Sequence, residues 1–124
     1  MMMTIGLLIG LGGAGCDAGP SASRSPASEF PAADPLRGQR LLAQYQCGSC
    51  HAIPGVAAAR GEQGPTLQAF GRRSYIAGHL PNQPDTLARW IVAPSALVPD
   101  TAMPGMGVSP VDARDMAAYL GGLE

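Results

Sequence analysis

Apolar and polar residues follow a helical pattern in the segment that begins at Asp34. Aspartate suits an N-cap and proline suits the first helical position, so Asp34-Pro35 is a typical helix start. We predict a helix from there to about Tyr45, in which Gly38 lowers the local propensity but permits close packing against another helix. Four residues give this helix a partly apolar face: Leu36, Leu41, Leu42 and Tyr45.

A second helical pattern lies around residues 85–92. Leu87, Trp90 and Ile91 stand at positions i, i+3 and i+4, which places them on one helix face. Pro94 should end this helix, because proline cannot continue the backbone hydrogen bonding.

The third helix is the most clearly marked. Ser109 suits the N-cap and Pro110 the first helical position, while Asp112 stands at the capping-box position. Gly121 suits the C-cap. The apolar residues between these ends follow at helical spacing: Met116, Tyr119 and Leu120.

Long loops separate the helices, at residues 52–67 and 94–110. A further short helix is expected over residues 66–72, and no stretch alternates in the way that predicts a strand. Loops of this length in a compact domain are typical of functional segments or of chain wrapped around a cofactor. We therefore predict three or four helices and long loops around a bound group.

The first 16 residues resemble an export signal. The apolar run at residues 5–11 is too short to span a bilayer as a helix but suits a signal sequence. The small residues before Cys16 resemble a bacterial lipobox, in which the cysteine receives a lipid, although Gly13 stands where that motif favours leucine. We expect residues 1–16 to be a signal peptide with lipidation at Cys16; cleavage without lipid and an uncleaved apolar tail are the alternatives.

Residues 17–33 are rich in Ser, Ala and Pro and nearly free of large apolar residues. Such a composition is typical of a disordered tether, here with a root-mean-square reach of roughly 20–25 Å. Residues 34–124 would then form the folded domain, in a periplasmic or other extracytoplasmic compartment and tethered to a membrane through the lipid. A chain of about 90 residues buries a limited core, so a large apolar cofactor would help to stabilise it.

The charges are nearly balanced, with eight arginines, nine acidic residues and no lysine. This balance provides no strong positive field, and we expect no nucleic-acid partner. The two histidines, His51 and His79, are too few for a metal cage without help from other residue types.

The motif CGSCH places Cys47, Cys50 and His51 together. A zinc site would usually need a second ligand pair, and beyond the motif the folded segment offers only His79. A thioredoxin-like redox pair would need a βαβ context, which the sequence lacks. Haem attachment explains more, since two thiols three residues apart can form thioethers with one porphyrin while the adjacent imidazole binds the iron.

A sixth iron ligand should come from the segment TAMPGMG. A methionine thioether is a soft donor that raises the reduction potential, and we favour Met103 because Pro104 rigidifies its loop. Met106 and His79 are the alternatives. Met116 is better explained as a core residue of the last helix.

Over almost all of Pro35 to Glu124, the chain resembles class I cytochromes c. The features that carry the likeness are CGSCH, Gly64-Pro65, Met103-Pro104 and the final AAYL, in the family order. A closer likeness, from GPTLQAFGRRSYIAGHLPNQPDTLARWIVAP to MPGM, is to the cytochrome c domain fused to haem–copper oxidase second subunits. The resemblance implies a small all-α cytochrome c fold around one covalently bound haem c.

The resemblance also implies roles for single residues. The Pro65 carbonyl would accept a hydrogen bond from the His51 ring, and Tyr119 and Leu120 would pack on the first helix near Gly38 and Leu41. Four residues are candidates for contacts to the haem propionates: Arg72, Arg73, Asn82 and Trp90.

The expected function is that of an exported electron carrier rather than an enzyme. Redox proteins such as a terminal oxidase or a dehydrogenase would be its partners, and no small-molecule substrate is expected. The fused oxidase subunits carry a copper domain and membrane helices upstream, whereas here we expect a signal and a tether before the domain. The alternatives are a haem c subunit of such a complex, and a gas-sensing or catalytic protein with an open iron site.

Overall fold

A computed structural model describes residues 32–124. The predicted signal, Cys16 and all but the last two residues of the predicted tether lie outside the described residues. The described elements are the helices α1 (Pro35–Gln44), α2 (Pro84–Val92), α3 (Pro94–Leu97) and α4 (Pro110–Gly121), the 3₁₀ helices η2 (Cys47–Ser49) and η3 (Phe70–Arg72), and the strands β1 (Tyr75–Ile76) and β2 (Leu80–Pro81). Within residues 32–124, no helix has the length and apolar composition that crossing a bilayer requires.

The three principal helices form where their end signals predict them. The Asp34 carboxylate accepts a hydrogen bond from the backbone N–H of Arg37 and caps α1. The Ser109 hydroxyl accepts one from the backbone N–H of Asp112 and caps α4. These side-chain bonds satisfy N–H groups that have no partner within the helix. The all-helical fold class is confirmed, and α4 ends one residue later than predicted, with Gly122 at its C-cap.

Three local predictions need correction. Pro94 follows α2, as expected, but it also begins α3, because Ala93 leaves the helical conformation and proline suits a first helical position. Only η3 forms within the predicted helix at residues 66–72, because Ala69 adopts a left-handed conformation with φ of 50°. The hairpin of β1 and β2 was not predicted; its antiparallel strands are two residues long, too short to show alternation.

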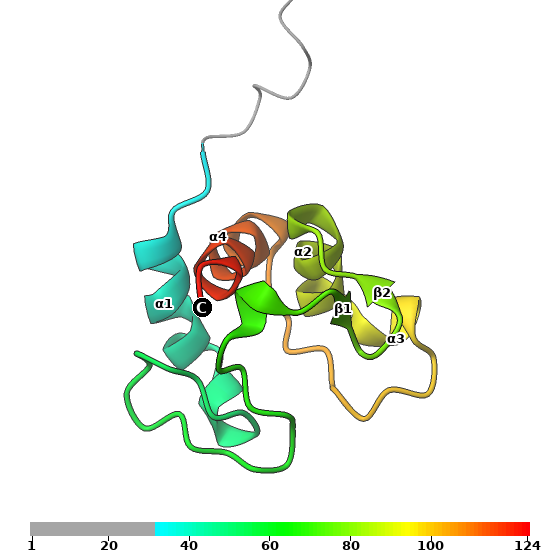
Figure 1. Cartoon of the computed structure of the whole chain (residues 1–124), viewed down its shortest axis with the longest axis horizontal. Helices are drawn as coiled ribbons and strands as arrows, with labels where there is room; N and C mark the ends of the chain where they lie inside the picture. The colour runs from blue at the N-terminus through cyan, green and yellow to red at the C-terminus, as the bar shows by residue number, and fades with distance from the viewer. Residues whose placement is uncertain (1–31) are drawn as a thin grey trace, which may run out of the picture. The chain divides into compact units, whose positions relative to one another are not determined.

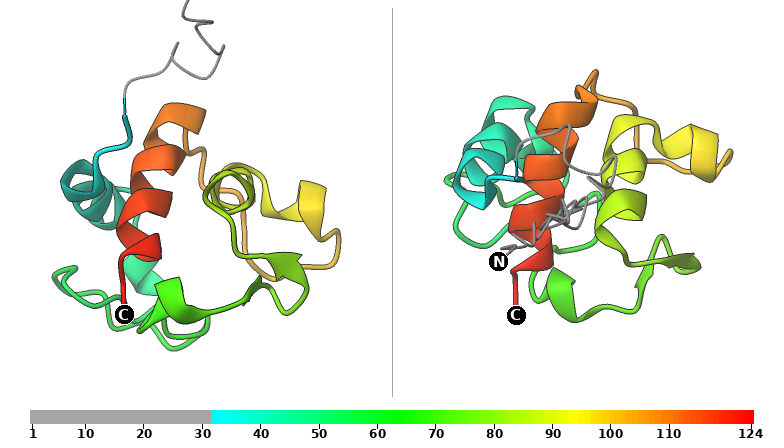
Figure 2. Two further views of the ribbon diagram at one scale, coloured as in Figure 1. Left: turned by 45° about the horizontal axis from the view of Figure 1, so that its top comes forward. Right: turned by 90° about the horizontal axis from the view of Figure 1, so that it is seen from above.

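Helix α4 lies between α1 and α2 in the described domain, as Figures 1 and 2 show. Gly38 makes the crossing with α1 possible: a Cβ at this position would lie 2.0 Å from the carbonyl oxygen of Asp115. The closest approach therefore involves Asp115 rather than Tyr119, whose hydroxyl donates to the Pro54 carbonyl instead. Leu36, expected on the apolar face, is 66% exposed.

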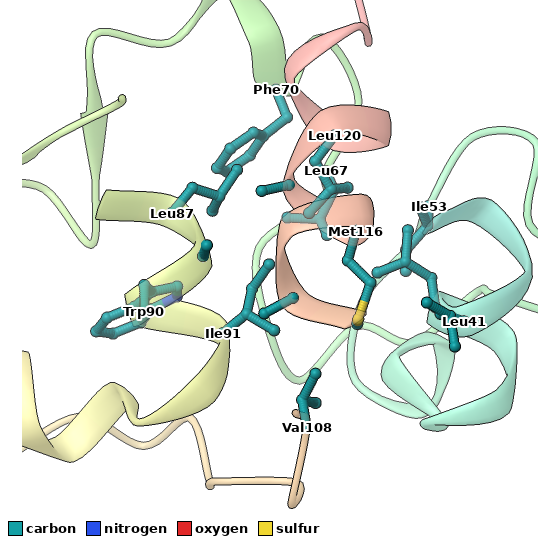
Figure 3. Close-up of a cluster of buried hydrophobic side chains, with 14 of the residues drawn as sticks. Leu41, Ile53, Leu67, Phe70, Leu87, Trp90, Ile91, Val108, Met116 and Leu120 are labelled. Atoms are coloured by element: carbon teal, nitrogen blue, oxygen red, sulfur yellow. The ribbon is translucent and has the colours of Figure 1, made fainter. Parts of the chain in front are cut away.

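The core lies on both sides of α4. Leu87, Trp90 and Ile91 of α2 are buried, as their helical spacing predicts, and Figure 3 shows them in the same cluster as Met116 and Leu120 of α4. Burying such side chains contributes about 1.5–3 kcal/mol each. The same cluster forms one wall of the site described below.

A polar cluster links both ends of α1 to the N-terminal half of α4. The Arg37 guanidinium forms ion pairs with Asp112 and Asp115, and the Tyr45 hydroxyl donates to the Asp112 carboxylate at 2.7 Å. The hydrogen bonds from Tyr45 and Arg37 hold the pKa of Asp112 below its ordinary value. The same carboxylate raises the pKa of the Tyr45 hydroxyl.

Asp112→Asn is expected to reduce the sensitivity of the fold to acid. A carboxyl whose pKa is lowered by folding adds stability above its unfolded pKa, and this stability is lost as the pH falls through the folded pKa. Urea unfolding from pH 6 down to pH 3 should show a smaller decline in the variant than in the parent protein. Asp100→Asn, which changes an exposed loop carboxyl, is the control, and an equal decline in all three proteins would contradict the prediction.

Candidate functional site

The CGSCH motif forms a tight turn directly after α1. Gln46 adopts a left-handed conformation with φ of 59° and starts η2. The backbone N–H groups of Cys50 and His51 then both donate to the Cys47 carbonyl, at 3.2 and 3.1 Å. The turn brings both cysteines and the histidine to the wall of one cavity.

This cavity has a volume of about 380 Å³. Met103 also lines it, although it comes from the loop between α3 and α4. Most of the remaining lining is apolar and includes Leu42, Pro65, Leu67, Phe70, Ile76, Leu87, Trp90, Ile91, Pro104, Met116 and Leu120. A concave, mostly apolar space with a few polar groups is the usual form of a cofactor site.

The His51 ring is oriented by its neighbours. Its Nδ1 lies 2.7 Å from the Pro65 carbonyl oxygen, and because a carbonyl can only accept, Nδ1 carries the proton. In the neutral imidazole, Nε2 is then left with a lone pair for a metal. The Pro65 contact implied by the family resemblance is therefore present in the geometry of the site.

Gly64 leaves room for this ring. A Cβ on Gly64 would lie 2.4 Å from Cε1 and 2.6 Å from Nδ1 of His51, well inside normal contact. Any larger residue would push the imidazole away from the Pro65 carbonyl.

Gly64→Ala is expected to break the hydrogen bond between His51 and Pro65. The NMR signals of the His51 ring should shift, and its Nδ1 proton should exchange faster with water, by about tenfold if a bond of ordinary net strength is lost. Gly105→Ala is the matched control, because a Cβ there would come no closer than 3.9 Å to its nearest neighbour. Unchanged His51 signals in Gly64→Ala would show that the ring is not held as described.

The two cysteines form no disulfide with each other, and their surroundings differ slightly. Burial raises the pKa of the Cys47 thiol. The Cys50 sulfur lies 3.7 Å from the side-chain oxygen of Gln63. Within residues 32–124, no group of three or more His, Cys, Asp and Glu side chains is arranged to hold a metal ion.

Of the proposed second ligands, Met103 has the position that the proposal requires. It is half-buried at the cavity wall, and its backbone N–H donates to the Thr101 hydroxyl at 3.2 Å. Met106 is 42% exposed and His79 is exposed, and neither is among the cavity-lining residues. Met116 is only 1% exposed and belongs to the core, as expected, while also touching the cavity.

The four residues that the resemblance suggests for contacts to the haem propionates lie in different positions. Arg73 and Trp90 line the cavity, whereas the lining does not include Arg72 or Asn82. The Asn82 amide donates to the backbone carbonyls of Phe70 and Arg73. Among the described lining residues, Arg73 is the one with a permanent charge.

The sequence pattern did not mark several lining residues, among them the polar residues Gln63, Tyr75 and Thr101. Tyr75 is 58% exposed and lies in the short hairpin, where the strands are too short to give a pattern of alternating residues. Thr101 precedes Met103 by two residues, and this spacing was the available signal for a residue that supports the methionine loop.

Comparison with known proteins identifies the family to which most of the chain is similar. Residues 36–124 match the family model described as Cytochrome c. The chain is also similar to a cytochrome c oxidase subunit 2 from Alkalihalophilus pseudofirmus, with 34% identity over 89 residues. That match covers 71% of this chain but 25% of the relative, so the chain spans about a quarter of the length of the relative.

Proposed function

Because the chain belongs to the cytochrome c family of electron-transfer haem proteins, we propose that it is an exported carrier with iron ligated by His51 and Met103. It would pass single electrons between proteins of a respiratory chain. The observation that carries this proposal is that the CGSCH turn and Met103, far apart in the sequence, line one apolar cavity.

The residues of the cavity fit haem c, the covalent cofactor of this family. The thiols of Cys47 and Cys50 would form the thioethers, and Nε2 of His51 would bind the iron on one side. Met103 would supply the soft thioether on the other side. When bound, the haem supplies one-electron Fe(III)/Fe(II) cycling.

The protein side of the mechanism is to hold and shield the cofactor. The Pro65 carbonyl accepts from the His51 ring and so increases its strength as a donor. The apolar residues of the wall exclude water from the cofactor. Arg73 and Trp90, which line the cavity, remain our candidates for contacts to the haem propionates.

Export and membrane attachment form part of the proposal through the sequence pattern of residues 1–33. A lipid on Cys16 would keep the domain near the membrane surface, where respiratory partners act. Because the chain contains no lysine, a lysine-based docking ring is excluded, and apolar contact around the haem edge would guide the choice of partner.

Expression with a c-type haem maturation system should give one covalent haem per chain. The pyridine haemochrome spectrum of the denatured protein would identify thioether-linked haem, and a reversible one-electron titration would establish the carrier function. The reduced protein should bind carbon monoxide poorly at neutral pH, because His51 and Met103 would both hold the iron. Cys47→Ala/Cys50→Ala is the control, and a parent protein without covalent haem would refute the assignment.

A second candidate function is that of a haem c subunit within an oxidoreductase complex. The observation in its favour is the similarity to an oxidase subunit 2. Purification from detergent-solubilised membranes distinguishes the two functions. A subunit would remain with an oxidase or dehydrogenase through the purification, whereas a carrier would separate from it.

A further inference from the structure

The Pro65 carbonyl that orients His51 belongs to a segment in which neighbouring backbone groups are also hydrogen-bonded. The Pro65 carbonyl accepts from the His51 ring at 2.7 Å. Two residues later, the backbone N–H of Leu67 donates to the Ala52 carbonyl at 2.8 Å. The Thr66 carbonyl between them accepts from a different partner, and this partner directly follows η3.

That partner is Arg73. Its guanidinium donates to the Thr66 carbonyl and, at 3.5 Å, to the Gln68 carbonyl. The same group lies over the Phe70 ring, 5.3 Å from the ring centre. The half-buried Arg73 side chain thus links the segment that carries Pro65 to the η3 turn.

Asn82 fixes the backbone from which Arg73 extends. Its side-chain amide donates to the Phe70 carbonyl at 3.1 Å and to the Arg73 carbonyl at 2.9 Å. An amide NH₂ has two donor hydrogens, and both are used here. The backbone N–H of Asn82 adds a third bond, to the Ser74 carbonyl at 3.0 Å. This residue therefore holds the turn and has no amide hydrogen left for a ligand in the cavity.

We infer that Arg73 is a positioning residue for the haem ligand His51, and that Asn82 supports it by holding the η3 turn. The inference rests on the proposed ligation by His51. A fixed Thr66 carbonyl keeps the adjacent Pro65 carbonyl in place, and this carbonyl sets the orientation and donor strength of the imidazole. Arg73 acts on the iron through backbone geometry as well as through its charge.

The test compares Arg73→Gln, Asn82→Ala and Arg72→Gln in the full-length haem protein. Arg72→Gln is the matched control, because it removes the same charge from the neighbouring, exposed position. The first readout is the exchange rate of the His51 Nδ1 proton in the reduced protein, measured by NMR. The second is the reduction potential.

Arg73→Gln and Asn82→Ala should speed this exchange by about tenfold, the change that loss of one ordinary hydrogen bond implies. Asn82→Ala, which keeps the Arg73 charge, should also raise the potential, because a more weakly donating imidazole stabilises Fe(III) less. Arg72→Gln should leave the exchange rate within about twofold of the parent value. If Arg73→Gln fails to fold, Asn82→Ala still decides the question, because it keeps the Arg73 charge.

Two results would overturn the inference. One is unchanged exchange in Arg73→Gln or Asn82→Ala; if the potential of Arg73→Gln changes all the same, Arg73 acts by charge alone. The other is equally fast exchange in Arg72→Gln. The absorption spectrum of the parent protein tests His51 ligation separately, so failure of the proposed function is distinguishable from failure of this inference.

Discussion

Met103→Ala is expected to convert a closed haem site into an open one. In the proposed ligation, loss of the thioether would remove the soft ligand that stabilises reduced iron, and the reduction potential should fall by on the order of 100 mV or more. The reduced variant should bind carbon monoxide readily, since one axial position becomes free. Potentiometric titration and carbon monoxide difference spectra are the measurements.

Met106→Ala is the matched control for that experiment. Met106 stands three residues further along the same loop, is 42% exposed and does not line the cavity, so its removal should leave the spectrum and the potential near those of the parent. If the Met106→Ala protein binds carbon monoxide and the Met103→Ala protein does not, then Met106 is the ligand and our assignment of Met103 is wrong. Carbon monoxide binding by the parent protein would instead favour the gas-sensing or catalytic alternative.

Gly38→Ala is expected to destabilise the fold severely. The new methyl group would stand 2.0 Å from the Asp115 carbonyl oxygen and 2.9 Å from the backbone nitrogen of Met116, so α1 and α4 would have to separate. Overpacking of this kind costs about 3 kcal/mol, more than the roughly 1 kcal/mol that alanine gains over glycine in a helix. The melting temperature should therefore fall by roughly 10–15 °C.

Gly121→Ala is the control, because it replaces another helical glycine at a position where nothing lies within 4 Å of the new Cβ. Thermal unfolding followed by circular dichroism should show this variant at or slightly above the parent stability. If Gly38→Ala has the same melting temperature as the parent protein, α1 and α4 do not cross as closely as described.

Much of the fold follows from signals within a few residues of one another. Asp34-Pro35 and Ser109-Pro110 start α1 and α4 because capping and the fixed φ of proline act locally. The helical spacing of Leu87, Trp90 and Ile91 predicted a buried face for the same reason. The strands and α3 could not be predicted from the sequence, because two residues per strand and four residues in α3 are too few to show a periodic pattern.

The candidate site was also partly predictable. CGSCH contains two attachment points and one metal donor within five residues, so its chemistry is a local property of the chain. The assignment of Met103 rather than Met106 as the ligand stays a proposal, although the burial of Met103 supports it. The roles of Arg73 and Asn82 were not visible, because their hydrogen-bond partners are backbone carbonyls that sequence patterns do not mark.

By itself, the sequence determined the helix ends, the apolar faces and the presence of a haem-attachment motif, since each depends on neighbouring residues along the chain. Only the tertiary structure decided which of these groups meet. It brought Met103 to the same cavity as His51, set Gly38 against Asp115, and tied Thr66 to Arg73. The physical reason is that contacts between distant segments depend on the packing of α1, α2 and α4 together, and packing is a property of all three helices at once.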